Sequence, residues 1–374
     1  MARFSFVSTL DSMPWGGSEL LWTQTAAHLR EQGHEVAVSV HWWPQIAAPI
    51  LALERAGCTM QFRRIRERQR IIAKTFSRPD PQAHLIESFL RQTAPDLAVL
   101  SFECQTPGIE WMEACSRQNI AYAFVVQAAV ERLWPPDHVN LPYSKAVEKA
   151  KGQFFVSQGN LEWVRKQLAL SLPQAKVVRN PFTVAYDAAP PWPSEGSTLR
   201  LACVGRLDPP SKGQDILLEV LKSEKWKERD IHITLFGSGA HEKSLRALCA
   251  LWELKNVSFG GHTCDVEAIW RDHHALILPS RVEGLPLVIV EALLCGRPCI
   301  VTDVAGNAEL VQDNETGFVA KAPIAEFVAE ALERAWSRRG DLEAMGYEGA
   351  RRVRGQVPRD PSAVFAAQLL DLLP

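Results

Sequence analysis

The chain of 374 residues lacks the features that mark several large classes of protein. Its apolar runs fall far short of the roughly 20 residues that a membrane-spanning helix requires. Its formal net charge is only −2, so no overall field favours nucleic acid as a partner. Its eight cysteines include no Cys-x-x-Cys spacing, which argues against a zinc site and suits reduced thiols in a cytoplasm.

Two short sequence patterns are also missing. Asp-x-Asp occurs nowhere, and no Gly-x-Gly-x-x-Gly follows the first expected strand, which disfavours a dinucleotide oxidoreductase. The N-terminal run 4–10 is brief and soon meets Asp11. We therefore predict that it forms a buried strand and is not a signal peptide.

Short apolar runs alternate with helix-length segments in both halves, which is typical of α/β domains with doubly wound parallel sheets. The expected strands lie at 4–8, 36–40, 97–101, 121–127, 154–157, 176–178, 199–204, 232–236, 257–259, 275–278 and 298–302. The stretch 188–197 is rich in proline and small residues and predicts a stiff linker. The expected organisation is two Rossmann-like domains at 1–185 and 198–355, a linker at 186–197 and a helical segment at 356–374.

The most informative run is 279–293, which leaves an apolar strand and turns into a helix. Pro286 suits the first helical position, and Gly296 suits the left-handed position that ends a helix. A helix N-terminus favours phosphate because it gathers free N–H groups and the positive end of the dipole. Glu291 lies roughly 7.5 Å further along the axis, beside the place of a ribose, and Glu283 lies in the loop on the other side. A sugar–diphosphate–nucleoside would span this arrangement.

Glu283 and Glu291 resemble the Glu-x7-Glu motif of the family-4 retaining glycosyltransferases, also called glycosyl transferases group 1. Five further resemblances occur in the family's order: Gly16-Gly17-Ser18-Glu19, Gly33-His34-Glu35-Val36, Asn180-Pro181, Gly205-Arg206-Leu207 with Lys212-Gly213, and Gly306-Asn307-Ala308-Glu309 with Glu315-Thr316-Gly317. The resemblance implies the GT-B fold, in which the two domains face each other across a cleft and the C-terminal helix crosses back to the N-terminal domain. It also implies transfer of a sugar from a nucleoside diphosphate to an acceptor hydroxyl with retention, by front-face displacement.

Arg206 and Lys212 follow the first strand of the second half and are expected to stabilise a departing diphosphate. Since Asp-x-Asp, the metal-binding motif of the other major transferase fold, is missing, we predict a metal-independent enzyme. We also expect no cofactor and a donor of the UDP or GDP type. We expect Glu291 to accept the ribose hydroxyls. The resemblance implies that Glu283 contacts the donor sugar, and a covalent nucleophile is the second option. The other donor-binding candidates are Gly205, Gly237, Ser238, His262, Gly284, Leu285, Pro286, Leu287 and Val288.

The acceptor-binding candidates lie in the first half. Gly16 and Gly17 would let the backbone approach a ligand closely, or would only form a strand–helix turn. Trp42 and Trp43 could stack on sugar rings, or could pack their loop onto the sheet. Gln127 stands where many relatives carry a histidine; it can bind a sugar hydroxyl but cannot act as a titrating base, which leaves an altered or lost activity open.

The basic run Arg63–Lys74 could contact anionic lipid, as a peripheral attachment at the inner membrane face, or could be a solvated helix or loop. We otherwise expect a cytoplasmic protein whose partners are the sugar donor and the acceptor; the oligomeric state is not indicated. The alternatives to a transferase are a nucleotide-sugar epimerase, a phosphorylase on the same fold, or a non-catalytic nucleotide-sugar binder. The sequence does not identify the base, the sugar or the acceptor.

Overall fold

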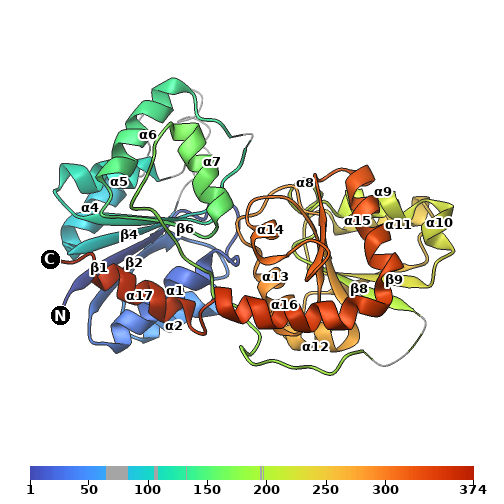
Figure 1. The fold of residues 1–374 in the computed structure, drawn as a ribbon. Helices are drawn as coiled ribbons and strands as arrows, with labels where there is room; N and C mark the ends of the chain where they lie inside the picture. Colours follow the sequence, from blue (N-terminus) through green and yellow to red (C-terminus); the bar gives the residue numbers. More distant parts are fainter. Residues whose placement is uncertain (65–82, 105–107, 132, 194–195, 197) are drawn as a thin grey trace. The chain divides into compact units, whose positions relative to one another are not determined.

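The protein divides into two compact units, which we describe separately (Figure 1). The computed structural model describes residues 1–64, 83–104, 108–131, 133–193, 196 and 198–374. Unit 1 comprises Met1–Pro181 and Asp360–Pro374, and unit 2 comprises Phe182–Arg359. The chain therefore changes units at 181/182 and 359/360, a few residues from the boundaries at 185 and 355 that the sequence suggests.

Unit 1 is built on a parallel sheet in the order β3-β2-β1-β4-β5-β6-β7. Its strands are β1 Arg3–Ser8, β2 Glu35–His41, β3 Thr59–Arg63, β4 Leu97–Phe102, β5 Tyr122–Val126, β6 Gly152–Phe155 and β7 Lys176–Val177. Its helices are α1 Glu19–Glu31, α2 Ala48–Arg55, α4 Ala83–Thr93, α5 Ile109–Arg117, α6 Asp137–Lys149, α7 Gln158–Leu168 and α17 Pro361–Leu370. The central strands are buried and almost wholly apolar, as expected for a parallel sheet covered on both faces.

The C-terminal segment belongs to unit 1, where α17 packs on α1 (Figure 1). Asp360 caps α17 by accepting a hydrogen bond from the backbone N–H of Ala363. The Thr25 hydroxyl donates to the carbonyl of Ser362, and the ring of Phe365 meets that of Phe154 edge-on at 5.0 Å. These contacts bury the apolar side of the last helix.

Unit 2 is built on a second parallel sheet, in the order β10-β9-β8-β11-β12-β13. Its strands are β8 Leu199–Val204, β9 Ile231–Phe236, β10 Val257–Gly261, β11 Ala275–Leu278, β12 Cys299–Thr302 and β13 Gly317–Ala320. Its helices are α8 Pro209–Lys212, α9 Gln214–Leu221, α10 Glu224–Lys227, α11 Glu242–Leu251, α12 Val266–Asp272, α13 Leu287–Leu294, α14 Asn307–Leu310, α15 Ala325–Ser337, η1 Arg339–Asp341 and α16 Leu342–Gln356. The expectation of two doubly wound parallel α/β units is confirmed.

The proline-rich stretch expected as a linker lies against unit 2 in its described part. The buried guanidinium of Arg297 donates to the carbonyls of Pro190 and Pro191, and that of Arg354 donates to the carbonyls of Tyr186 and Ala188. An extended segment outside a sheet needs partners for its carbonyls, and these two arginines supply them.

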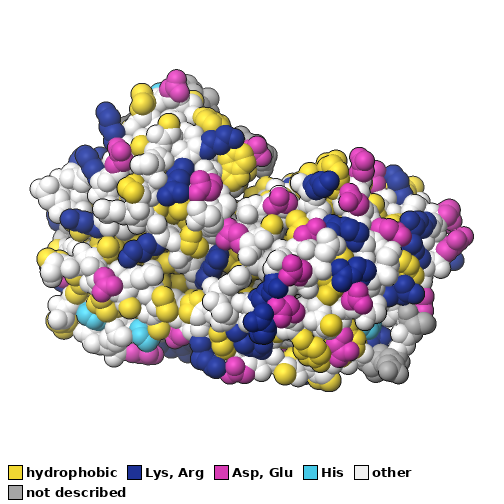
Figure 2. Space-filling view, in the orientation of Figure 1, with side chains coloured by type: hydrophobic (Ala, Val, Ile, Leu, Met, Phe, Trp, Pro, Cys, Tyr) yellow, Lys and Arg dark blue, Asp and Glu magenta, His cyan; other side chains and the backbone are white. Residues whose placement is uncertain are grey.

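The surface of the described residues mixes both signs of charge. On the face drawn in Figure 2, Lys and Arg side chains lie interspersed with those of Asp and Glu. On α16, Arg351 and Arg352 pair with Glu348, and Arg352 also pairs with Glu315. None of the helices in the described residues combines the length and apolar character needed to span a bilayer.

Candidate functional site

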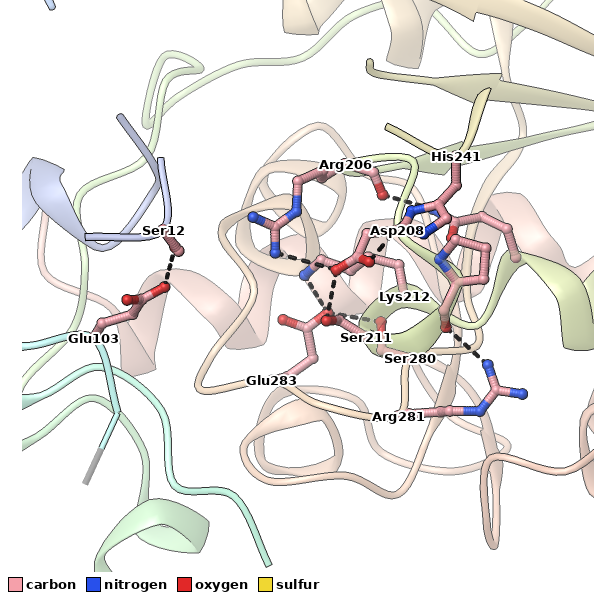
Figure 3. A network of polar contacts seen from close by, with 12 residues as sticks. Ser12, Glu103, Arg206, Asp208, Ser211, Lys212, His241, Ser280, Arg281 and Glu283 are labelled. Carbon is pink, nitrogen blue, oxygen red and sulfur yellow. Dashed lines mark hydrogen bonds and ion pairs between the residues drawn. The ribbon is translucent and has the colours of Figure 1, made fainter. Parts of the chain in front are cut away.

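The candidate site lies at the carboxyl edge of the unit 2 sheet, where β8 and β11 are neighbours. Loops that follow adjacent parallel strands meet at this edge, and ligands bind there in open α/β sheets. The loop after β8 carries Arg206 and leads through α8 to Lys212. The loop after β11 carries Glu283 and leads to α13. The fold therefore brings together residues that lie about 70 positions apart in the chain (Figure 3).

The two loops are locked against each other by their backbones. Gly213 has φ +66°, and a Cβ there would lie 2.0 Å from the carbonyl oxygen of Pro279, so only glycine fits. The N–H groups of Arg281 and Val282 both donate to the carbonyl of Ser211, at 2.8 and 3.1 Å. The relative position of Lys212 and Glu283 is thus fixed by main-chain contacts and does not depend on their side chains alone.

Arg281 adds a second lock between the loops. Its guanidinium makes a bidentate pair with Asp215, at 2.6 and 2.8 Å, and donates to the carbonyl of Pro209 at 2.8 Å. The Asp215 carboxylate raises the pKa of Arg281, so this cation keeps its charge and its geometry. Arg281 therefore holds the α8 segment against the loop that follows β11. Its charge is already paired with that of Asp215.

Glu283 and Lys212 form an ion pair at the centre of the site (Figure 3). The Lys212 ammonium donates to Glu283 Oε1 at 2.6 Å, and the Ser280 hydroxyl donates to the same oxygen at 2.7 Å. Glu283 is only 7% exposed, whereas the side chain of Lys212 is 21% exposed. A ligand can therefore reach the ammonium, which has three N–H donors and uses one of them on Glu283.

Arg206 lies beside this pair and is held by Asp208, which the sequence analysis did not single out (Figure 3). Arg206 Nη2 lies 3.3 Å from Asp208 Oδ2, and the Ser211 hydroxyl donates to that oxygen at 2.7 Å. His241 Nδ1 lies 3.7 Å from Asp208 Oδ1. The side chain of Arg206 is 43% exposed, so it offers a second cation to solvent next to Lys212. A carboxylate two residues after Arg206 was the signal for this contact.

The helix that follows Glu283 begins one residue later than expected. Pro286 has ψ 126° and is the N-cap residue, so α13 starts at Leu287 and Pro286 is not its first helical residue. Gly296 has φ +70° and follows the end of the helix, as predicted. The side chains of Leu285 and Val288 are buried, so a ligand at this helix start would meet backbone N–H groups.

Glu291 is buried on α13 and accepts hydrogen bonds from a residue that the sequence analysis missed. Its Oε1 accepts from the backbone N–H of Thr183 at 3.0 Å and from the Thr183 hydroxyl at 2.7 Å. Burial raises the pKa of Glu291, because desolvation outweighs these two hydrogen bonds. The Asn180-Pro181 resemblance three residues earlier was the nearest signal for Thr183.

The Gly237-Ser238-Gly239 loop lies against the loop that carries Arg206. A Cβ on Gly237 would lie 2.0 Å from the carbonyl of Gly205, and one on Gly239 would lie 2.3 Å from that of Leu207. The N–H of Leu207 donates to the carbonyl of Ser238 at 3.0 Å. Close backbone packing therefore explains both glycines and places this loop at the edge of the site. His262 is exposed just after β10, and its role stays a prediction.

The acceptor candidates all belong to unit 1. Gly16 and Gly17 begin the turn into α1, where their carbonyls accept from the N–H groups of Glu19 and Leu20. Trp42 is partly exposed, and the guanidinium of Arg64 lies over its ring at 3.9 Å. Trp43 lines a cavity of about 20 Å³. That volume would hold one water molecule or one hydroxyl group, and the stacking role of Trp43 stays a prediction.

Gln127 follows β5 and is buried. Its Oε1 accepts a hydrogen bond from Asn180 Nδ2 at 2.8 Å, so an acceptor candidate contacts a residue of the Asn180-Pro181 resemblance in unit 1. Within the described residues, Gln127 Nε2 and Asn180 Oδ1 are buried without a hydrogen-bond partner. One unsatisfied donor and one unsatisfied acceptor suit a hydroxyl group or a water molecule.

One member of the basic run is placed differently from the expectation. Arg63 is the last residue of β3 and is only 2% exposed, so it cannot contact lipid. It donates to the Ser8 carbonyl and to the Ser39 hydroxyl, inside unit 1. Arg64 is exposed, and the rest of the run to Lys74 lies outside the described residues. In the part of the chain that the structure describes, no three His, Cys, Asp or Glu side chains are grouped to hold a metal ion.

Comparison with known proteins first identifies the class to which this fold and site correspond. Residues 198–338, which contain the site, match the family described as Glycosyl transferases group 1. The whole chain has the GT-B fold of solved glycosyltransferase structures. Anabaena Alr3699/HepE in complex with UDP superposes with a TM-score of 0.76 at 15% identity, over 99% of this chain and 100% of that one. Sucrose-phosphate synthase of Thermosynechococcus elongatus gives 0.74 at 16% identity, over 99% of each chain.

Particular curated relatives match over shorter regions. A GDP-mannose-dependent alpha-(1-6)-phosphatidylinositol monomannoside mannosyltransferase of Mycobacterium tuberculosis is 31% identical over 225 residues, covering 54% of this chain and 56% of that protein. An uncharacterized glycosyltransferase of Haemophilus influenzae is 32% identical over 124 residues, covering 33% of this chain and 35% of that protein. The chain thus spans about half or less of the length of these relatives.

Proposed function

We propose that this protein is a retaining glycosyltransferase that moves a sugar from a nucleoside diphosphate to an acceptor hydroxyl without a metal ion. The observation that supports this best is the pairing of Lys212 with Glu283, beside Arg206 and at the start of α13. It combines reachable cations for a diphosphate with a buried carboxylate for sugar hydroxyls. The relative from M. tuberculosis is named for GDP-mannose, and the Anabaena structure contains UDP, which supports a GDP- or UDP-type donor.

The proposed roles follow from charge. The bond between the anomeric carbon and the diphosphate oxygen breaks, and negative charge grows on the departing diphosphate. Arg206 and Lys212 stabilise that charge, together with the N–H groups at the start of α13. The acceptor oxygen bonds to the anomeric carbon on the same face, and its proton passes to the departing phosphate oxygen. This scheme needs no separate base, which agrees with a glutamine at position 127.

In this proposal the two buried glutamates bind different parts of the donor. Glu283 accepts hydrogen bonds from hydroxyls of the donor sugar, and Glu291 accepts them from the ribose. Thr183 already donates twice to Glu291 Oε1, so it orients this carboxylate before a nucleotide arrives. Non-catalytic binding of a nucleotide sugar is the second candidate, because Gln127 replaces a titratable residue.

We also propose a cytoplasmic location. All eight cysteines are free thiols, and several are buried in the cores of the two units. Burial raises the pKa of the Cys203 and Cys295 thiols to about 12, which keeps them protonated and unreactive. Peripheral membrane contact would have to use residues after Arg63, since Arg63 itself is buried.

The test is a calorimetric binding panel of UDP, GDP, ADP and dTDP in the absence of divalent metal. We expect one of them to bind clearly more tightly than the rest, and the matching nucleotide sugar to be hydrolysed slowly or transferred. Binding without hydrolysis or transfer would favour the non-catalytic candidate. An epimerised sugar nucleotide would point to an epimerase, and dependence on free phosphate would point to a phosphorylase. No binding of any of the four would refute the donor site.

A further inference from the structure

A chain of buried polar groups connects the loop after β12 to Glu283. The Asn307 side-chain amide donates to the carbonyl of Thr302 at 3.1 Å, and the Thr302 hydroxyl donates to the carbonyl of Ser280 at 2.6 Å. The Ser280 hydroxyl then donates to Glu283 Oε1 at 2.7 Å. Ser280, Thr302 and Asn307 are completely buried. None of these three was predicted to belong to the site.

The same loop also holds the other end of the Glu283 loop. The N–H of Gly306 donates to the carbonyl of Gly284 at 3.0 Å. Thr302 and Gly306 therefore fix the peptide groups on both sides of Glu283, at Ser280 and at Gly284. This gives a physical role to the Gly306–Glu309 sequence, which lies more than 20 residues from Glu283 in the chain.

Ser280 and Lys212 both donate a hydrogen bond to Glu283 Oε1, but a bound ligand would affect the two donors differently. The ammonium is partly exposed and would be attracted to an incoming diphosphate. The Ser280 hydroxyl is buried and stays in place. With Oε1 held by Ser280, the second oxygen, Oε2, keeps one orientation; within the described residues Oε2 accepts no hydrogen bond. A carboxylate held in this way meets a substrate without first losing rotational freedom.

We propose that Ser280 and Thr302 are positioning residues for Glu283, which present its Oε2 to the hydroxyls of the donor sugar while Lys212 engages the diphosphate. This inference rests on the proposed function and deepens it. It separates nucleotide recognition, which does not need Ser280, from sugar recognition, which does.

The test compares Ser280→Ala with two substitutions of Thr302 and a matched control. Thr302→Val removes the hydroxyl with little change of shape, and Thr302→Ser keeps it. Thr316→Val is the control, because Thr316 is equally buried in unit 2 but its hydroxyl accepts from the N–H of Gln312. For each protein the measurements are the thermal midpoint, the Kd of UDP and GDP, the Kd of UDP-glucose and GDP-mannose, and kcat and KM for hydrolysis of the donor that the wild type uses.

For Ser280→Ala we expect kcat to fall about tenfold or more, which corresponds to losing one hydrogen bond to a charged group. The Kd of the bare nucleotide should stay within about twofold, while the extra affinity contributed by the sugar is lost. Thr302→Val should show the same pattern more weakly, and Thr302→Ser should restore wild-type behaviour. Thr316→Val should resemble the wild type in every measurement except the thermal midpoint.

Two results would overturn the inference alone. One is a Ser280→Ala protein with unchanged kcat, and the other is a loss of bare-nucleotide affinity as large as the loss of sugar affinity, since that indicates general loosening of unit 2. If Ser280→Ala does not fold, the Thr302→Val and Thr302→Ser pair decides by the same criteria. A wild type that neither binds nor turns over any donor would instead refute the proposed function, and this inference with it.

Discussion

The two units share one architecture but place different chemistry at the carboxyl edges of their sheets. In unit 2, Lys212 and Arg206 are reachable from solvent and each has a carboxylate partner. In unit 1, Arg63 ends β3 but is buried, and its described hydrogen bonds go to a carbonyl and a hydroxyl. A cation at this edge is therefore available to a ligand only where the loops leave it exposed, and the buried Arg63 instead bonds to groups inside its own unit.

The buried carboxyl groups show the same contrast. Glu283 in unit 2 is paired with an ammonium group. Glu19 in unit 1 sits at the start of α1 beside the hydroxyls of Ser8 and Ser18, and no cation pairs with it among the described residues. Burial raises the pKa of Glu19 to about 7, because hydroxyl partners offset only part of the desolvation. Glu283 thus has a countercharge at the place proposed for the donor sugar, whereas Glu19 in unit 1 and Glu291 in unit 2 are buried with uncharged hydrogen-bond partners.

The largest effect is expected from Lys212→Met, which removes the reachable cation and leaves Glu283 without its countercharge. Donor turnover should fall about 10²–10³-fold, the usual cost of losing one group that stabilises charge in a transition state. The matched control is Lys222→Met, since Lys222 also pairs with a glutamate of unit 2, at 3.1 Å, but at the exposed C-terminal end of α9. Equal turnover in the two variants would show that the Lys212–Glu283 pair contributes no more to activity than an ordinary surface ion pair.

The second prediction concerns Glu19 and the pH dependence of unit 1. The pKa of Glu19 is about 7 in the folded chain against the ordinary value of 4.5 for a glutamate, so the folded state holds the proton more tightly. Stability is therefore highest below about pH 4.5 and falls as the pH rises through about 7, by on the order of 3 kcal/mol. Glu19→Gln, which mimics the neutral acid, should remove this dependence.

The measurement for Glu19 is native-state hydrogen exchange of α1 amides between pH 5 and pH 8, with the amides of α13 as the internal reference. Protection of α1 in the wild type should weaken relative to that of α13 as the pH rises, and the Gln variant should keep the ratio constant. A constant ratio in the wild type as well would contradict the raised pKa.

The third prediction is smaller. Glu291→Ala should weaken nucleotide binding by about 1–3 kcal/mol, because ribose hydroxyls lose a charged acceptor. Calorimetry with the preferred nucleoside diphosphate measures this, and Thr183→Val serves as the companion variant that keeps the carboxylate but loses one of its donors. Unchanged affinity in Glu291→Ala would remove Glu291 from the ribose role.

The last prediction is that removing divalent metal ions has no effect on donor turnover. A chelator should leave donor turnover unchanged, since Arg206 and Lys212 supply the positive charge in the proposed scheme. Activity that is lost with a chelator and restored by a divalent ion would refute the metal-free mechanism. A metal ion would then act in the site together with the two side-chain cations.

Much of the fold could be predicted because buried parallel strands are continuous apolar runs. The strands at 4–8, 97–101 and 275–278 were expected nearly as they are found. Two edge strands were missed: β3, whose sequence Thr-Met-Gln-Phe-Arg mixes polar and apolar residues, and the four-residue β13, which begins with glycine. β3 is only partly buried, so its apolar pattern is weak, whereas β13 is buried but too short to show a clear pattern.

The residues of the candidate site were proposed from the sequence one by one, but the contacts among them were not. Lys212 and Glu283 were both expected at the donor, yet their ion pair joins positions 71 residues apart. Thr183 and Glu291 lie 108 residues apart, and a lone threonine in a loop gives no signal of its own. Such contacts depend on how two loops approach each other, which local propensity and periodicity do not encode.

The Lys212–Glu283 pair has a further consequence for which anions the site admits. Glu283 acts as a tethered competitor for the ammonium, at an effective concentration on the order of millimolar or more. Simple anions such as free phosphate must compete with this built-in carboxylate, and they lack the second attachment that a nucleoside would give. A molecule that is also held through a nucleoside can displace it. The pair is therefore expected to favour ligands that attach at two places over the inorganic anions that surround the protein.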